Sequence, residues 1–292
     1  MESKVRKKSV IELIVRNIFR VFLILLFLFP VGILFWVSVK TPKDISNALL
    51  GWPTQWNLSE NYSKAVEKMD FVVGIRNSLI VTIISTVCLC VFSSMAAWVL
   101  VRRKSKISTF IFMLFSVSML IPFQCVMIPL LKLWGKRGIS GMDFFGYNFN
   151  FLSHTGLILA YIGFGSAMSI LLYHGFIKGI PVELEEAAAI DGCSNVGIFF
   201  KIVFPLLGPI TTTVAIINIM WIWNDYLLPK QMIGGTRSYW TLPLQTYSFF
   251  GSFTVDWGVA AAALMLIMAP VIIFYLAAQK KIVKGVVDGA VK

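Results

Sequence analysis

Residues 186–192 read Glu186-Ala187-Ala188-Ala189-Ile190-Asp191-Gly192 and lie in a polar interruption, residues 178–208, between two long apolar runs. Pro181 suits the first position of a helix, where its missing N–H is not needed. The acidic residues after it would lie near the positive end of the helix dipole, and the three alanines favour helix. Gly192 can adopt the left-handed conformation that commonly ends a helix. The sequence therefore predicts a short acidic helix that ends at a tight turn.

A second short helix is predicted after this turn, with Ser194 as its N-cap and Pro205 at its end. Its apolar face is expected to consist of Val196, Phe199, Phe200 and Val203. The two helices would form a compact helix-turn-helix that binds a partner protein. An amphipathic loop resting on the bilayer is the alternative, although its glutamates are poorly placed against an anionic leaflet.

The composition of the chain points to a membrane protein. Its 292 residues are 58% hydrophobic with a mean hydropathy of +0.80, which is too apolar for a soluble domain. A spanning helix needs about 20 mainly apolar residues. Six runs meet this requirement: residues 18–39, 73–101, 107–131, 155–177, 209–228 and 259–279. An all-α membrane protein with six transmembrane helices is predicted.

Basic residues are concentrated in three places, which indicates the orientation. They are Lys4, Arg6, Lys7, Lys8, Arg16 and Arg20, then Arg102, Arg103, Lys104 and Lys106, then Lys280, Lys281, Lys284 and Lys292. Because cytoplasmic loops carry an excess of Lys and Arg, both termini and the 178–208 loop are expected to be cytoplasmic. This distribution also accounts for the net charge of +12, so nucleic acid is not needed as a partner.

Sequence motifs for catalysis are absent. The chain has no Gly-x-x-x-x-Gly-Lys-Ser/Thr phosphate loop, nucleophile elbow, zinc motif or dinucleotide fingerprint. Its four cysteines form no disulfide framework, and its two histidines make a metal site a poor expectation. We therefore expect no ATPase site, metal site or cofactor site in this chain.

The polar loop resembles the EAA loop of ABC importer permeases. The resemblance is carried by Glu186-Ala187-Ala188, Gly192 and Ile202-Val203-Phe204-Pro205, where Phe204 stands in place of the family's leucine. Further segments are similar to the carbohydrate-uptake branch, and specifically to the second permease of the maltose transporter family. They are Arg76-Asn77-Ser78-Leu79-Ile80, Ile121-Pro122-Phe123-Gln124, Trp223-Asn224-Asp225-Tyr226, Thr241-Leu242-Pro243, Val283-Lys284-Gly285 and Gly289-Ala290-Val291-Lys292.

This resemblance implies a type I ABC importer permease fold in a bacterial-type cytoplasmic (inner) membrane. It implies ATP-driven, binding-protein-dependent import of sugars, with oligosaccharides as the expected class, by alternating access. The implied partners are a homologous second permease, two ATP-binding cassette subunits that hold ATP and Mg²⁺, an extracytoplasmic sugar-binding protein and membrane lipid.

The resemblance also implies that the first loop helix is the coupling helix, seated in a cleft of an ATPase subunit. The implied coupling residues are Leu184, Glu185, Glu186, Ala187, Ala188, Asp191, Gly192 and Pro205. A second contact with the ATPase is implied for the carboxyl tail, at Lys284, Gly285 and Gly289.

Polar and aromatic residues within the runs are candidates for the substrate pathway. They are Gln124, between the helix-bending Pro122 and Pro129, and Asn218, Trp221, Asn224 and Asp225. An aromatic belt is the alternative role for Trp221, and a helix cap is the alternative for Asn224 and Asp225.

The expected organisation has three parts. Residues 1–72 hold the amino-terminal tail, the first span (a retained anchor) and an external segment whose residues 59–69 form a surface helix. Residues 73–281 form a five-helix core with the coupling loop, and residues 282–292 form a cytoplasmic tail. The rival readings are a stand-alone secondary transporter, a permease for another solute and a purely structural membrane protein. A secondary transporter would need an internal repeat or ion-coupling residues in the spans, and neither is evident.

Overall fold

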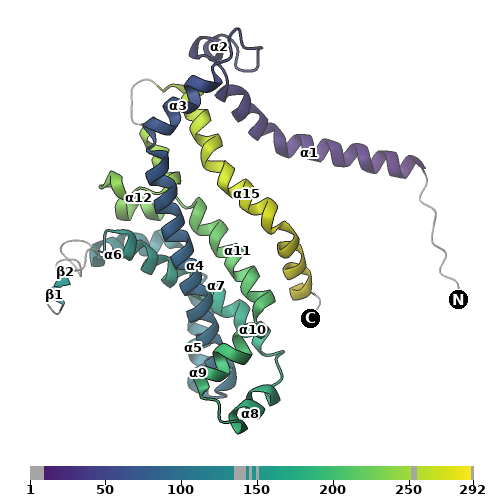
Figure 1. The fold of residues 1–292 in the computed structure, drawn as a ribbon, viewed down its shortest axis with the longest axis vertical. Coiled ribbons are helices and arrows are strands. Elements are labelled where there is room, and N and C mark those ends of the chain that lie inside the picture. Colours follow the sequence, from purple (N-terminus) through teal and green to yellow (C-terminus); the bar gives the residue numbers. More distant parts are fainter. Residues whose placement is uncertain (1–9, 135–142, 145–146, 149–150, 251–254, 291–292) are drawn as a thin grey trace. The chain divides into compact units, whose positions relative to one another are not determined.

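A computed structural model describes residues 10–134, 143–144, 147–148, 151–250 and 255–290 (Figure 1). The described chain is helical apart from two short strands, β1 (Asp143–Phe144) and β2 (Tyr147–Asn148), which pair antiparallel. The long helices are α1 (Val10–Ser38), α4 (Phe71–Arg102), α5 (Lys106–Ser118), α6 (Phe123–Trp134), α7 (His154–Ile177), α11 (Gly208–Asn224) and α15 (Trp257–Ala290).

The remaining helices are short. They are α2 (Pro42–Asn47), α3 (Leu58–Lys68), α8 (Glu183–Ile190), α9 (Asn195–Ile198), the π-helix η2 (Phe199–Val203), α10 (Phe204–Leu206), α12 (Leu227–Ile233), the 3₁₀-helix η3 (Arg237–Tyr239), α13 (Leu242–Gln245) and α14 (Tyr247–Phe250). The expected surface helix at residues 59–69 is therefore present as α3.

Two compact units make up the chain. Residues 1–69 and 246–268 form the first, and residues 70–245 and 269–292 form the second. The first unit thus contains a segment, 246–268, that the sequence assigned to the core of residues 73–281. Helix α15 contributes residues to both units.

The first unit is organised around a buried lysine. The Lys40 side chain is fully buried, and its Nζ donates to the carbonyls of Ala48 and Leu49, each at 2.9 Å. Asn61 on α3 is also buried and donates to the carbonyls of Ser38 and Lys40 at 2.9 Å. These bonds satisfy carbonyls that no regular element pairs, so they hold the segment after α1 against α3.

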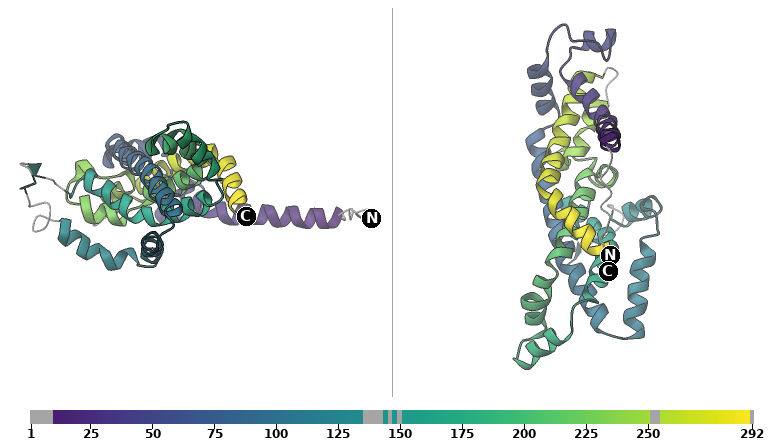
Figure 2. Two further views of the ribbon diagram at one scale, coloured as in Figure 1. Left: turned by 90° about the horizontal axis from the view of Figure 1, so that it is seen from below. Right: turned by 90° about the vertical axis from the view of Figure 1, so that its right-hand side faces the viewer.

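The second unit contains the helices that matter most for the loop. Helices α4, α7 and α11 pack together (Figures 1 and 2), and α5 contacts α7 and α4. One apolar cluster lies under the loop and includes Ala97, Tyr173, Phe199 and Val203, each at most 1% exposed. The loop formed by α8 to α10 therefore rests on the ends of α4 and α7.

Four helices are long and apolar enough to cross a membrane: Glu12–Ser38, Phe71–Arg102, His154–Ile177 and Trp257–Gln279. They coincide with four of the six predicted runs. Two further candidates are bent pairs, Lys106–Ser118 with Phe123–Trp134 at 103° and Asn195–Leu206 with Gly208–Asn224 at 78°. The described residues therefore provide four spans, or up to six if each bent pair counts as one.

The observed helix ends correct two expectations about the spans. The predicted run 107–131 is not one straight helix, because α5 ends at Ser118 and α6 begins at Phe123, just after Pro122. Proline disfavours helix in the residue before it, which explains a break at this point. The predicted run 209–228 ends early as well, since α11 stops at Asn224.

The candidate coupling loop

Helix α8 begins two residues later than the sequence suggested. Pro181 lies outside the helix, and Val182 is the N-cap. The Val182 carbonyl accepts the N–H groups of Glu185 and Glu186 at 2.9 and 3.1 Å, so the helix is initiated at Val182 instead. The predicted acidic first turn is confirmed, with Glu183, Glu185 and Glu186 near the positive end of the helix.

Glu185 anchors α8 to the end of α4. Arg102 donates to one carboxylate oxygen of Glu185 through Nε at 2.9 Å and through Nη2 at 2.7 Å. Trp98 Nε1 donates to the other carboxylate oxygen at 2.9 Å, and Arg102 also reaches the carbonyl of Ile180 at 3.0 Å. The Glu185 side chain is only 9% exposed. Glu185 therefore fixes the position of α8 against the end of α4.

The two faces of α8 have different environments. Ala188, three residues after Glu185, is 6% exposed and belongs to the cluster under the loop. Ala187 and Glu186 are exposed, Leu184 is 45% exposed, and Ile190 is 86% exposed. Leu184 and Ile190 are thus two apolar side chains of α8 that the described chain leaves uncovered.

Gly192 ends α8 as predicted, in the left-handed conformation with φ +81°. Its N–H donates to the carbonyl of Ala189 at 3.1 Å, and the N–H of Cys193 donates to the carbonyl of Ala188 at 3.0 Å. This pair of bonds is the Schellman motif, which satisfies the last carbonyls of a helix. Asp191, the C-cap before it, is exposed.

The second loop helix confirms one expectation and corrects two. Ser194 is the N-cap of α9, and its Oγ accepts from the Gly197 N–H at 3.2 Å. The predicted apolar face is correct for Phe199 and Val203, which are buried, and wrong for Val196 and Phe200, which are 63% and 45% exposed. The buried residues here are Ile198, Phe199 and Val203.

A π-helical turn follows α9 and changes the direction of the side chains after it. Residues Phe199–Val203 form η2, in which the Phe204 N–H donates to the Phe199 carbonyl five residues earlier. The wider turn rotates the following side chains away from an α-helical pattern. Pro205 does not end the segment, since it lies inside α10, which continues to Leu206.

The other predicted contact region lies in α15. Lys284, Gly285 and Gly289 have helical backbone in the last turns of this helix, which ends at Ala290. The tail of residues 282–292 is therefore a continuation of a long helix as far as residue 290. Residues 291–292 lie outside the described part of the chain.

Two of the predicted pathway residues meet at one aromatic side chain. Tyr161 on α7 is fully buried, its hydroxyl donates to Asp225 Oδ2 at 3.0 Å, and its ring lies edge-on to Trp221 with centroids 5.4 Å apart. Asp225 also accepts the Leu227 N–H at 3.0 Å, which fits its alternative role in capping the next helix. Sequence reasoning missed Tyr161, since only the fold brings it to Asp225.

The other three candidates lie apart. Asn218 is 5% exposed and donates to Ser169 Oγ at 3.1 Å and to the Val214 carbonyl at 2.8 Å. Asn224 is exposed and donates to the Met220 carbonyl at 2.7 Å. Gln124 is exposed at the start of α6.

A small cavity of about 260 Å³ lies between α4, α11 and α15. Thr82 and Trp223 contribute to its lining, with Pro270 from α15. The Trp223 Nε1–H is buried without a hydrogen-bond partner, as are the hydroxyls of Ser85 and Thr86 on α4. Buried polar atoms usually have hydrogen-bond partners. These three groups of the second unit are therefore free to bond to a polar ligand. Among the described residues, no cluster of His, Cys, Asp or Glu is suited to a metal ion.

Comparisons with known proteins agree with this geometry. The chain is 43% identical over 268 residues to the "Probable starch degradation products transport system permease protein AmyC" of Thermoanaerobacterium thermosulfurigenes, covering 92% of this chain and 93% of that protein. It is 34% identical over 272 residues to the "Multiple sugar-binding transport system permease protein MsmG" of Streptococcus mutans (92% and 93%). It is 35% identical over 267 residues to the "Melibiose/raffinose/stachyose import permease protein MelC" of Bacillus subtilis (90% and 91%).

The fold has a solved counterpart. A chain in the crystal structure of a bacterial ABC transporter involved in the import of the acidic polysaccharide alginate matches with a TM-score of 0.72 at 20% identity, covering 92% of this chain and 96% of that one. Residues 89–288, which include the loop, match the family model for the binding-protein-dependent transport system inner membrane component. The chain therefore belongs to the family of membrane-embedded permease subunits of binding-protein-dependent ABC transport systems.

Proposed function

We propose that this chain forms one half of the pathway of an ATP-driven sugar importer in a bacterial inner membrane. Its relatives are named as permeases for starch degradation products, for multiple sugars and for melibiose, raffinose and stachyose, which supports oligosaccharides as the cargo. A homologous permease would complete the pathway, and an extracytoplasmic binding protein would deliver the sugar. The chain carries no phosphate-loop motif, so two separate cassette subunits would bind ATP and Mg²⁺.

The proposed topology has six spans with both termini in the cytoplasm. It treats each of the two bent pairs as one span, which raises the count from four to six. It also places the α8 loop on the side where the ATPase subunits lie. The basic residues at the end of α4 and the start of α5 support this orientation.

The exposed face of α8 is the observation that carries the coupling proposal. Ile190 is 86% exposed next to the exposed Ala187, while Glu185 on the inner face is bound to Arg102. A helix held firmly on one side and uncovered on the other can transmit movement of a docked partner to α4. We therefore assign Leu184, Glu186, Ala187 and Asp191, together with the exposed Ile190, to contact with the ATPase.

The buried residues of the predicted coupling set have a different proposed role. Glu185 and Ala188 position the helix, and Gly192 forms the turn that ends it. Pro205 lies in α10 and belongs to the support of the loop. The helical end of α15, with Lys284, Gly285 and Gly289, is proposed as a second contact with the ATPase.

Co-purification from the native host tests the coupling proposal. The full chain, extracted in mild detergent, should bring down an ATPase and a second permease. Ile190→Arg should reduce recovery of the ATPase at least severalfold, because it places a charge in an apolar contact. Val66→Arg, which adds the same charge at an exposed aliphatic position on α3, is the control. Equal recovery with both variants, or a native chain that purifies alone, would refute the proposal.

The cargo is tested separately. Cells that lack this chain should lose uptake of one class of labelled oligosaccharide, and the native gene should restore it. Asn218, Trp221, Asn224, Asp225 and Gln124 remain the proposed pathway residues. Uptake that is lost for a non-sugar solute, with all sugars unaffected, would contradict the assignment of cargo.

A further inference from the structure

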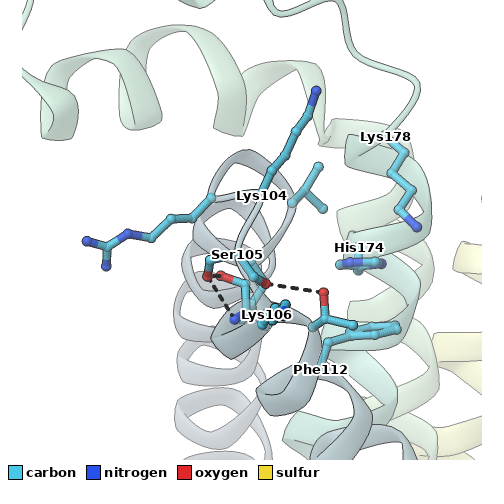
Figure 3. A pocket seen from close by; sticks show the side chains of 11 residues that line it. Lys104, Ser105, Lys106, Phe112, His174 and Lys178 are labelled. Carbon is cyan, nitrogen blue, oxygen red and sulfur yellow. Dashed lines mark hydrogen bonds between the residues drawn. The ribbon is translucent and has the colours of Figure 1, made fainter.

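A hollow of about 680 Å³ lies where α4, α5 and α7 end together, wholly within the second unit (Figure 3). Its lining combines basic, hydroxyl and apolar side chains. The residues are Leu100, Val101, Arg103, Lys104, Ser105, Lys106, Ser108, Thr109, Phe112, His174 and Lys178. Of the loop at residues 178–208, only its first residue, Lys178, contributes to this lining, and none of the candidate sugar-pathway residues does.

The hollow carries a concentrated positive charge. Four lining residues are basic (Arg103, Lys104, Lys106 and Lys178) and none is acidic. Within the described part of the chain, none of these four has a carboxylate within ion-pairing distance. The neighbouring Arg102, by contrast, is paired with Glu185. Unpaired like charges around a hollow attract an anion, because each raises the potential felt by the others.

Helix α5 directs its N-terminus toward the same place. Ser105 is its N-cap, and the Ser105 Oγ accepts from the Ser108 N–H at 3.1 Å. The Ser105 and Ser108 hydroxyls are hydrogen-bonded to each other at 3.1 Å (Figure 3). The positive end of a helix of 13 residues adds to the attraction for an anion, and it does so beside hydroxyl groups that can donate.

His174 provides an independent sign of a missing ligand. Its side chain lines the hollow, is 8% exposed and stacks on Phe112, with ring centroids 3.7 Å apart and planes inclined by 16° (Figure 3). Among the described residues, neither ring nitrogen has a hydrogen-bond partner. The ring nitrogens are not among the fully enclosed polar atoms, and the side chain lines the hollow, so the imidazole N–H is available to an oxygen bound there.

The surroundings indicate what kind of anion fits. The hollow lies at the ends of two candidate spans, which stop at Arg102 and Ile177, so in the proposed six-span topology it would lie at the level of the lipid headgroups. Next to it, α5 exposes a series of large apolar side chains: Ile107 (71% exposed), Phe110 (60%) and Leu114 (53%). A cationic hollow beside an apolar helix surface matches the two halves of a phospholipid.

We propose that this hollow binds the phosphate of an anionic phospholipid, with Lys106 and Lys178 as the main charge contacts and His174 as a hydrogen-bond donor. The acyl chains would lie along the exposed side of α5. This site does not depend on the proposed transport function, since the chain would hold the lipid whether or not it couples to an ATPase.

Lipid titration of the full purified chain, followed by native mass spectrometry, tests the proposal. Phosphatidylglycerol should bind more tightly than phosphatidylcholine. Each basic side chain near an anionic lipid contributes about fivefold, so Lys106→Gln with Lys178→Gln should weaken phosphatidylglycerol binding by about tenfold or more. Both side chains are exposed, so the double variant is expected to fold.

The matched control removes two exposed charges elsewhere, by Lys132→Gln with Lys201→Gln. It should leave the affinity within about twofold of the native chain, because neither residue lines the hollow. Equal weakening by both double variants would overturn the proposal in favour of diffuse attraction. His174→Phe keeps an aromatic ring on Phe112 and removes the donor. It should weaken binding severalfold, and an unchanged affinity would overturn the role of His174.

Two further measurements distinguish the source of the anion. Inorganic phosphate in large excess should fail to displace phosphatidylglycerol. If phosphate displaces the lipid, and this displacement depends on Lys106 and Lys178, the hollow is a phosphate site. Its ligand is then free phosphate, and the proposal of a bound lipid is wrong. The complex with ATPase subunits should retain the bound lipid. Loss of the lipid whenever the ATPase is present would overturn the lipid site in favour of an acidic protein surface.

Discussion

The guanidinium group of Arg102 at the end of α4 binds the carboxylate of Glu185 in α8 through two nitrogens, at 2.9 and 2.7 Å. The two residues are 83 positions apart in the sequence, and their pairing is what attaches α8 to a candidate membrane span. Both side chains are mostly buried, at 22% and 9% exposure. Removing either one would therefore leave an incompletely paired charge in the support of the loop.

A double-mutant cycle on this pair should show strong coupling. Arg102→Leu or Glu185→Leu alone should each lower stability by about 2 kcal/mol, because the remaining charge keeps too few partners. The loss of stability in the double variant should be smaller than the sum of the losses in the two single variants, with a coupling energy of about 1–3 kcal/mol. Thermal unfolding of the purified chain measures this, and strictly additive losses would show that the pair is not a unit.

Replacement of Gly192 tests the turn that ends α8. A Cβ at this position would meet no atom within 4 Å, so the effect of a side chain comes from the backbone angle, φ +81°, and not from crowding. Gly192→Val should cost about 1–2 kcal/mol or more and reduce recovery of the ATPase, since a branched residue disfavours the left-handed region.

Gly192→Asn is the matched control for this replacement. Asparagine adopts the left-handed conformation more readily than other residues, so this variant should retain most of the binding. Co-purification with the ATPase compares the two variants. A loss of equal size for both would indicate that any side chain at 192 obstructs docking.

Two glycines of α7 make a direct test of packing around Asn218. A Cβ on Gly165 would lie 2.7 Å from Leu89 Cδ1 and 2.9 Å from Asn218 Oδ1, whereas a Cβ on Gly163 would meet nothing within 4 Å. Gly165→Ala should therefore destabilise the chain by about 1–3 kcal/mol, as overpacking of a core does. Gly163→Ala should leave the melting temperature unchanged or slightly higher. Equal melting temperatures for the two variants would contradict the close approach of α4, α7 and α11.

Lowering the pH should destabilise the folded segment that follows α1. The Thr54 hydroxyl donates to Asp44 Oδ1 at 2.8 Å, and this bond is the main reason that the pKa of Asp44 is lowered from its ordinary value of 3.8. A lowered pKa means that Asp44 stabilises the folded segment above pH 3.8 and that this contribution is lost as the pH falls through the folded pKa. Tryptophan fluorescence should report the change, because Trp36 contacts Trp52 and donates to the Gly51 carbonyl.

Two variants check the assignment of this acid transition. Asp44→Asn should abolish it, since the amide does not titrate in this range. Thr54→Val should shift its midpoint upward, towards the ordinary carboxyl value, because the hydroxyl that lowers the pKa is gone. A transition that is unchanged in Asp44→Asn would have to come from another acidic group.

The sequence predicted the straight spans well and the bent ones poorly. Helices α1, α4, α7 and α15 are continuous apolar runs, and run length is what the bilayer thickness selects. Pro122 signalled a disturbance in the third run, but a single proline is compatible with a mild kink or with a 103° break, and only packing decides between them.

The parts of the coupling loop that depend on interactions between neighbouring residues could be predicted from the sequence. Gly192 and Ser194 were predicted correctly, because a C-terminal glycine and a serine N-cap act through bonds to nearby backbone groups. The different roles of Glu185 and Glu186 could not be predicted, since both are acids in the same helical turn. What separates them is Arg102, which only the folded chain brings to one of them.

The π-helical turn at Phe199–Val203 has a consequence for comparing sequences in this family. Its hydrogen bond closes over five residues where an α-helical turn closes over four, so it accommodates one extra residue within the same helical rise. Relatives that have a regular helix here should be one residue shorter, and an alignment should place a single gap within 199–203. An ungapped alignment would mismatch every position on one side of this turn, including either the acidic loop helix or α11.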